Sequence, residues 1–273
     1  MHVSGASVRA LRLVILFCGV WGCGSDHHAA KGKAAQTAHN LPKAERHYRD
    51  AISMDPEHAE ALAGLGWVYL LAGQVEAASA SFAQCINSHP TDPECLRGSA
   101  SVASAKGNPG EARRLLNEAL EHNPQHSGVI SSTALLDLAA GRVDEAARRY
   151  RQLVTREPDR AEYRLGMAEA LMRGKEHREA LTEIEAGLAI SDAPKRTRAM
   201  LLQTQARALV AASAKRVDPK NCAATAEPVR AWLDAADRAV SLADSLAIAL
   251  PDLPVVKRRV RNQRARVSEL CPG

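Results

Sequence analysis

Aromatic side chains are scarce in this sequence: Phe, Tyr and Trp together make up 3% of its 273 residues. A large β-sheet core is built mainly from β-branched and aromatic residues, so this composition argues against one. Alanine is abundant, and alanine, leucine, glutamate and arginine all favour helices. Charged residues make up 25% of the chain, which argues against long disordered tracts. The composition therefore predicts a soluble, all-α protein.

The sequence also lacks the short motifs that mark common active sites. It has no glycine-rich phosphate loop, no His-Glu-x-x-His motif and no Ser-x-x-Lys motif. His122 and His126 have the spacing of two helical metal ligands, but Pro124 between them argues against a shared helix. His27 and His28 lie in a polar stretch with no further ligand motif. We therefore predict a protein that is not an enzyme, with no catalytic residues, cofactor, metal site or small-molecule substrate.

No apolar run reaches the roughly 20 residues that a membrane-spanning helix needs. The N-terminal run LVILFCGVWG follows two positive charges, Arg9 and Arg12, and has the length of a signal-peptide core. The residues VWGC, followed by GSD, resemble a bacterial lipobox, so we predict a signal peptide over residues 1–22 and lipidation of Cys23. Ordinary signal cleavage nearby and an uncleaved membrane anchor are the alternatives. Residues 23–40 are polar and are predicted to form a tether.

Cysteine is rare as well, with six in the chain. Removal of the signal peptide and lipidation of Cys23 would leave an even number, as an oxidising compartment favours. We predict a disulfide between Cys222 and Cys271, which would staple the irregular C-terminal third, and a second between Cys85 and Cys95. The alternative is a set of buried free thiols, which are common in helical cores.

What the sequence does contain is a pattern repeated every 34 residues. Alanine recurs at that interval, and each alanine is followed four residues later by a large apolar residue. The alanines are Ala44, Ala78, Ala112, Ala146 and Ala180, and the large residues are Tyr48, Phe82, Leu116, Tyr150 and Ile184. Prolines keep the same interval at Pro56, Pro90, Pro124 and Pro158. Turn glycines recur at Gly73, Gly107 and Gly141 and then slip by one, to Gly174. Small residues would let paired helices approach, large ones would fill the gap to the next pair, and proline would end each second helix.

This pattern resembles the tetratricopeptide repeat, a helix–turn–helix unit of the same length. The resemblance implies an all-α fold: a right-handed superhelical solenoid of such repeats with extra C-terminal capping helices. We assign one partial and four complete repeats to residues 41–194. The first helices match less well than the second ones, because Ser99, Asp137 and Arg164 replace apolar residues there. These polar residues reflect either the demands of binding or weak repeats.

Residues 195–273 depart from the pattern and are predicted to form a degenerate sixth repeat and capping helices. We expect a break over residues 217–228 between two long helical stretches. In the last segment, one helical face is expected to carry Val256, Val260, Val267 and Leu270. Basic residues cluster in the same segment, at Lys257, Arg258, Arg259, Arg261, Arg264 and Arg266. The solvated face of a capping helix is the preferred interpretation, with contact to lipid headgroups or to nucleic acid as alternatives.

In tetratricopeptide arrays the first helices usually line a concave groove that holds a peptide or helix of a partner. The resemblance implies that this groove is lined by Trp67, Leu70, Arg97, Ser101, Ser131, Leu135 and Glu169. Trp67 is larger than packing requires and is the candidate anchor, since exposed tryptophans are common at binding sites. Packing of Trp67 between repeats is the alternative.

Together these features predict a non-enzymatic protein–protein interaction scaffold, anchored by lipid in the bacterial cell envelope and facing the periplasm. The architecture resembles small repeat lipoproteins that help assemble pili or envelope complexes. Its partners would be a protein or peptide in the groove and the membrane that holds the lipid. The alternative is an inner-membrane-anchored or cytosolic adaptor whose basic C-terminal helix binds an acidic partner or nucleic acid.

Overall fold

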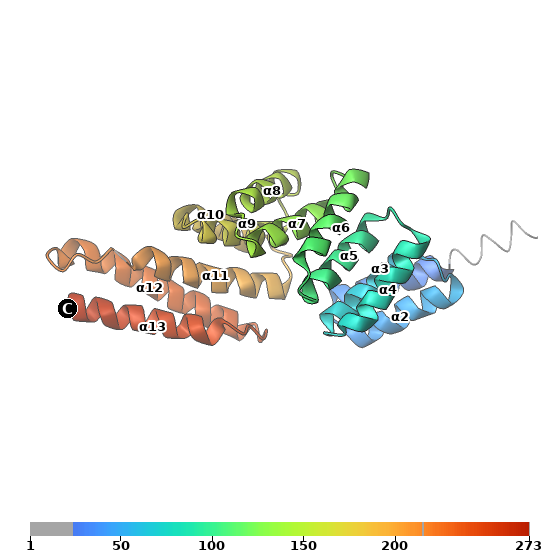
Figure 1. Cartoon of the computed structure of the whole chain (residues 1–273). Helices are drawn as coiled ribbons and strands as arrows, with labels where there is room; N and C mark the ends of the chain where they lie inside the picture. The colour runs from blue at the N-terminus through green and yellow to red at the C-terminus, as the bar shows by residue number, and fades with distance from the viewer. Residues whose placement is uncertain (1–23, 215, 273) are drawn as a thin grey trace, which may run out of the picture. The chain divides into compact units, whose positions relative to one another are not determined.

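The computed structural model describes residues 24–214 and 216–272, and within those ranges no residue belongs to a β-strand (Figure 1). The predicted signal peptide and Cys23 lie outside the described residues. An N-terminal helix over residues 24–37 is followed by α2 (Leu41–Met54), α3 (Ala59–Leu71), α4 (Val75–Ser88), α5 (Pro93–Ala105), α6 (Pro109–His122), α7 (Ser127–Ala139), α8 (Val143–Arg156), α9 (Ala161–Arg173), α10 (His177–Leu188), α11 (Lys195–Ser213), α12 (Cys222–Ser245) and α13 (Leu253–Leu270). The described residues divide into two compact units: unit 1 extends up to Ser132, and unit 2 begins at Thr133.

The tight turns within helix pairs repeat with the sequence period. Among the described residues, six have left-handed backbone, and five of them are spaced 34 apart: His39, Gly73, Gly107, Gly141 and Lys175; the sixth is Ala247, after α12. Glycine adopts this conformation without a steric penalty, which explains the three central residues. The expected slip to Gly174 is absent from the backbone, because Gly174 caps α9 in a right-handed conformation and Lys175 keeps the left-handed position. The repeat is therefore regular from residue 39 to residue 175.

The N-terminal helix corrects the expectation of a polar tether over residues 23–40. Ala29 is fully buried, and a side-chain oxygen of Gln36 accepts a hydrogen bond from the Tyr48 hydroxyl at 2.8 Å. A Cβ added at Gly32 would lie 2.7 Å from the Tyr48 ring, so the helix and α2 are in close contact. The missed signal was Gly32, which lies one repeat length before Gly66. The first repeat is thus a complete helix pair whose outer face is polar.

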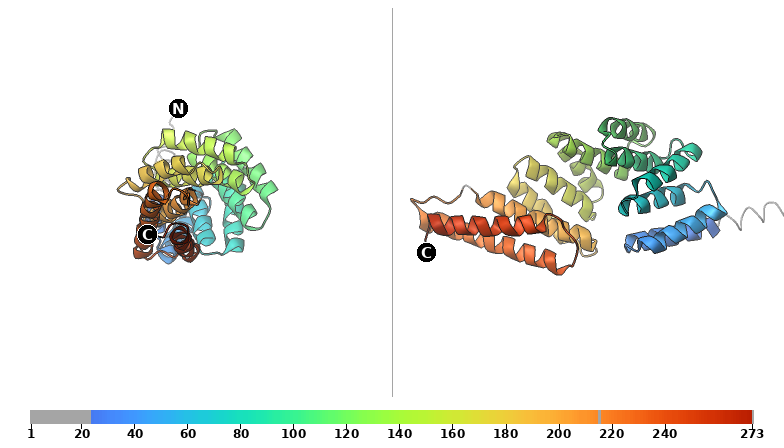
Figure 2. Two further views of the ribbon diagram at one scale, coloured as in Figure 1. Left: turned by 90° about the vertical axis from the view of Figure 1, so that its left-hand side faces the viewer. Right: turned by 60° about the horizontal axis from the view of Figure 1, so that its bottom comes forward.

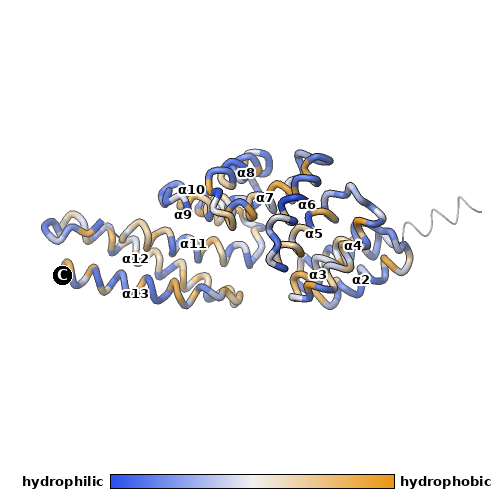
Figure 3. The backbone as a smooth tube through the Cα atoms, in the orientation of Figure 1, coloured by the Kyte–Doolittle hydropathy of each residue, from blue (hydrophilic) through white to orange (hydrophobic). Residues whose placement is uncertain are grey.

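In unit 2, α11, α12 and α13 pack around one hydrophobic cluster (Figure 2). Val256, Val260 and Val267 are buried in it, as the spacing predicts. Leu270 was expected on the same face but is 37% exposed, because α13 ends at this residue and the chain turns toward Cys271. Figure 3 shows α13 as a mostly hydrophilic helix in which hydrophobic residues recur at intervals.

The start of α12 differs from the sequence-based prediction. A break was expected over residues 217–228, but the helix begins at Cys222 and includes Pro228. Proline removes one backbone hydrogen bond and usually ends or bends a helix. The helix continues here with Val229 and Leu233 buried in the unit 2 cluster, so tertiary packing outweighs the local preference.

Candidate protein-binding surface

Buried aromatic rings set the distance between the first helices in unit 1. Phe82 of α4 is fully buried, and its ring lies between Gly66 of α3 and Gly98 of α5. A Cβ added at Gly66 would lie 2.7 Å from the ring, and one at Gly98 only 2.0 Å from it. Ordinary carbon–carbon contacts are about 3.5–4.0 Å, so any side chain at Gly98 would clash. The ring and the two glycines thus let α3 and α5, which belong to consecutive repeats, contact each other.

The second glycine of this arrangement is a signal that the sequence analysis missed. A glycine follows each repeat aromatic by 16 residues. The pairs are Tyr48 with Gly64, Phe82 with Gly98 and Tyr150 with Gly166. Where the large residue is the smaller Leu116, the residue 16 positions later is Ser132. The size of the ring and the absence of a side chain therefore go together, because each ring occupies the space that a Cβ would fill.

The first helices of unit 1 line a pocket of about 630 Å³. Its walls include Lys33, Gln36, Glu60, Ala63, Trp67 and Glu94. The pocket is open because small residues of α3 face it, and its rim carries charges of both signs. Lys33 donates a hydrogen bond to Glu60 at 3.0 Å across this rim. The result is a recess with one aromatic wall and a charged edge.

Trp67 is half-buried and contributes to both packing and the pocket wall. Its ring meets the Phe82 ring edge-on, with 5.3 Å between centroids. The guanidinium carbon of Arg97 lies 4.1 Å from the centroid of the Trp67 ring. Arg97 is held there by Glu94, which accepts its Nε–H at 3.0 Å. The structure therefore combines the two interpretations of Trp67, since one edge packs against Phe82 while the ring also borders the pocket.

A tetratricopeptide repeat family model matches residues 35–101 and 137–212, which together make up more than half of the chain. The protein belongs to the tetratricopeptide repeat family. This confirms the resemblance drawn from the 34-residue pattern, and the helical repeats match the expected fold class. Such repeat proteins are generally non-enzymatic scaffolds that bind protein or peptide partners, so the fold supports an interaction scaffold. No curated protein sequence matches the chain.

Several solved tetratricopeptide structures are similar to this one at low sequence identity. A repeat protein from Parabacteroides merdae has 16% identity and a TM-score of 0.62, over 87% of this chain and 84% of that one. PilF from Pseudomonas aeruginosa has 16% identity and a TM-score of 0.59, over 90% of this chain and 99% of that one. PilW, a type IV pilus biogenesis factor, has 14% identity and a TM-score of 0.61, over 85% and 97%. At these identities the similarity shows the fold alone.

The repeat structure places the remaining predicted groove residues of unit 1 near Trp67 or at the end of the unit. Leu70 is half-buried and packs against the unit 1 core. Ser101 donates a hydrogen bond from its hydroxyl to the backbone carbonyl of Arg97 at 3.1 Å. Ser131 is half-buried in α7. Of the predicted set, the structure brings Trp67 and Arg97 into direct contact.

The two predicted groove residues of unit 2 have different surroundings. Leu135 is 57% exposed. Glu169 is already paired, since its Oε1 accepts from the Thr204 hydroxyl at 2.9 Å and from Arg207 at 2.7 Å. Leu135 is thus available for an apolar contact, while Glu169 ties α9 to α11.

Polar residues in the first helices of unit 2 form internal ion pairs. Asp137 is 1% exposed and contacts Arg142 at 2.9 Å and also Arg149. Arg164 pairs with Glu183 at 3.0 Å, joining α9 to α10. Asp137 is buried, and Arg164 and Glu183 are mostly buried. At these first-helix positions an ion pair therefore takes the place of apolar packing. A buried carboxylate between two guanidinium groups is stable only while both remain in place.

The basic cluster on α13 is partly neutralised within unit 2. Arg264 contacts Asp234 at 2.8 Å and also Asp237, and Lys257 contacts Asp244 at 2.9 Å. The hydrogen bond from Arg264 to Asp234 is the main cause that raises the pKa of the guanidinium, against a smaller effect of burial. These pairs join α13 to α12. The arginines at 258, 259, 261 and 266 are exposed, as the solvated face of a capping helix requires.

Two disulfides join the cysteines in the pairs expected from the sequence. Cys85 of α4 is bonded to Cys95 of α5, with 5.6 Å between Cα atoms. Cys222 at the start of α12 is bonded to Cys271 after α13, with 5.5 Å between Cα atoms. The first links consecutive repeats of unit 1, and the second closes the C-terminal helices of unit 2. Among the described residues, no helix combines the length and apolar character needed to span a membrane.

Proposed function

We propose that this tetratricopeptide repeat protein is an interaction scaffold of the bacterial cell envelope, anchored by lipid at Cys23 and facing the periplasm. The observation that carries the binding part is the unit 1 pocket of about 630 Å³, with Trp67 in its wall. An apolar side chain of the partner would lie against the Trp67 ring, while polar groups of the partner would meet Lys33, Glu60 and Glu94 at the rim. Tryptophan in a partly desolvated recess is a common centre of binding energy.

The envelope part of the proposal rests on the sequence of the N-terminus and on the cysteines. A cleaved signal peptide and lipidated Cys23 would deliver the protein to an oxidising compartment, where disulfides persist. The disulfides Cys85–Cys95 and Cys222–Cys271 suit such a compartment. The structural similarity to PilF and to PilW, a type IV pilus biogenesis factor, supports a role in assembling a pilus or another envelope complex.

In-cell crosslinking of the full-length protein, followed by mass spectrometry of the crosslinked partners, tests the binding part. The Trp67→Ala variant should lose most of the capture of one envelope complex. Trp232→Ala is the matched control, because Trp232 is also half-buried with an arginine near its ring, Arg216 at 5.1 Å, but lies in unit 2. Circular dichroism should show both variants folded. Equal capture by both variants would contradict a binding site at Trp67.

The same experiment separates the scaffold from the adaptor alternative. Recovery of ribosomal or nucleoid material in place of envelope proteins would favour binding through the basic α13. The localisation is tested by intact-mass analysis of the membrane fraction. Loss of residues 1–22 and an added acyl mass on Cys23, both absent from a Cys23→Ser variant, would support the lipid anchor. An unprocessed mass in the cytosol would contradict it.

A further inference from the structure

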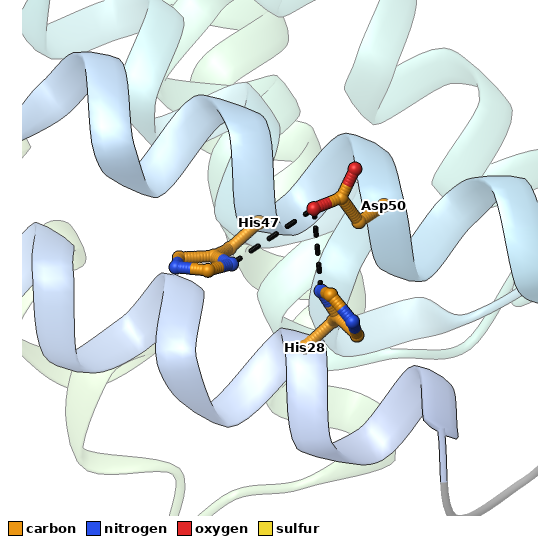
Figure 4. A group of neighbouring side chains, drawn as sticks. All are labelled: His28, His47 and Asp50. Atoms are coloured by element: carbon orange, nitrogen blue, oxygen red, sulfur yellow. Dashed lines mark ion pairs between the residues drawn. The ribbon is translucent and has the colours of Figure 1, made fainter.

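Three side chains with metal-binding chemistry meet between the N-terminal helix and α2. His28 comes from the N-terminal helix, and His47 and Asp50 lie three residues apart on α2, which places them on one face. Figure 4 shows the Asp50 carboxylate pointing between the two imidazole rings. The sequence did not indicate this group, because His28 was expected in a tether and His47 belongs to the following helix.

The distances suit a single metal ion. One ligand atom from each of the three residues lies within 4.8 Å of the other two. The Nδ1 atom of His28 is 3.3 Å from Oδ2 of Asp50, and Nδ1 of His47 is 4.0 Å from the same oxygen. In a tetrahedral zinc site with bonds near 2.0–2.1 Å, neighbouring ligand atoms are about 3.3 Å apart. The separation between His28 and Asp50 already has this value, and the other two, which lie within 4.8 Å, have to shorten by side-chain movement.

The two imidazole nitrogens have no other role within the described part of the chain. Nδ1 of His28 and Nδ1 of His47 are both buried and make no hydrogen bond there. Buried polar atoms are nearly always satisfied, and two such atoms facing one carboxylate call for an explanation. The ring centroids lie 5.7 Å apart, and the ring planes are tilted by 56°.

The charges around the group are mixed. Burial lowers the pKa of His47, with Arg46 and His28 acting in the same direction and Asp50 opposing them. Lys31 also acts to lower it, from the N-terminal helix. Arg46 and Lys31 oppose the approach of a cation, so Asp50 is the ligand on which charge compensation depends.

We propose that His28, His47 and Asp50 bind a divalent transition-metal ion, with Zn²⁺ as the best fit. Two nitrogen ligands and one carboxylate oxygen suit zinc and disfavour Mg²⁺ and Ca²⁺, which prefer oxygen ligands. Water or an external ligand would complete the coordination. The ion would join the N-terminal helix to α2 and so stabilise the helix that immediately follows the predicted lipid anchor.

Isothermal titration of Zn²⁺ into untagged, full-length protein in detergent tests this site. The wild type should bind one ion per chain, and His47→Gln and Asp50→Asn should each weaken binding by more than about tenfold, the scale of losing a supporting group at a metal site. His122→Gln is the matched control, because His122 is an exposed helical histidine far from the group in sequence. It should bind zinc as the wild type does.

Hydrogen exchange of residues 24–37 provides a second measurement that does not depend on affinity. Zinc should slow exchange of these amides in the wild type and in His122→Gln, but not in His47→Gln. Circular dichroism without metal should show that all variants are folded. Equal zinc binding by all variants, or an unchanged exchange rate in the wild type, would overturn the proposal.

Discussion

Substitution of Gly98 by alanine tests the packing that brings the first helices of unit 1 together. The added Cβ would lie 2.0 Å from one carbon of the Phe82 ring and 2.3 Å from two others. Ordinary contacts are about 3.5–4.0 Å, so the ring or α5 would have to move by about 1.5 Å. The ring has little freedom, because it is fully buried and lies against Gly66 on its other side.

The expected cost follows from two opposing effects. Overpacking of a core costs about 1–3 kcal/mol, and the tight Gly98 contact belongs at the upper end. Alanine is favoured over glycine in a helix by about 0.8–1 kcal/mol, which offsets part of this. Gly98→Ala should therefore destabilise unit 1 by about 2 kcal/mol. Gly110→Ala is the control, since the nearest atom to its new Cβ is 3.7 Å away and the helical preference alone should act.

Urea unfolding followed by circular dichroism gives the stability, and hydrogen exchange of α3 and α5 assigns the change to unit 1. Exchange is needed because a repeat protein with two compact units need not unfold in one step. Phe82→Leu should destabilise the Gly98→Ala variant less than it destabilises the wild type. The difference, which is the coupling energy of the two positions, should be about 1 kcal/mol or more. Equal stability changes for Gly98→Ala and Gly110→Ala, or additive effects of Gly98→Ala and Phe82→Leu, would refute the predicted clash with the ring.

Three further predictions concern unit 2. Asp137→Ala should destabilise unit 2 by about 1–2 kcal/mol, since it removes the charged hydrogen bonds to Arg142 and Arg149 while both arginines stay partly exposed to water. The exposed Asp159→Ala should change the urea midpoint little, and equal midpoints would contradict the contribution of the Asp137 pairs. Reduction of Cys222–Cys271 should lower the stability of unit 2 by about 2–4 kcal/mol in thermal unfolding, and an unchanged midpoint would show that the bond does not constrain α12 and α13. Deletion of residues 254–273 should expose the apolar face of α11 and α12 and cause aggregation in light scattering, while a monomeric, equally stable product would show that α13 is not a cap.

Much of the fold was predictable because its signals are local. The 34-residue period of Ala78, Phe82 and Pro90 predicts a helix pair by spacing alone, and the family match confirms it. The N-terminal helix was missed because its residues are polar on average, although Gly32 is in register with Gly66. Composition averages over both faces of a helix, whereas burial depends on one face.

The candidate surface was predictable only in outline. Matching repeats predicted that Trp67 and Arg97 line the same groove, and the structure adds that the guanidinium lies over the ring. The repeat pattern did not show that Glu169 would be paired with Arg207 or that Asp137 would be buried. Side-chain pairing depends on which helices lie beside each other, and the repeat period does not specify it.

The sequence by itself determined the helix pairs, their turns and the rule that a large ring is accompanied by a glycine, because each depends on residues a fixed distance apart in the chain. Only the tertiary structure decided that His28 and His47 share a carboxylate, that Asp137 lies between two arginines, and that the first helices of unit 1 line an open pocket. Those arrangements join residues at irregular separations. They arise when helices pack, since packing brings together side chains that no sequence period relates.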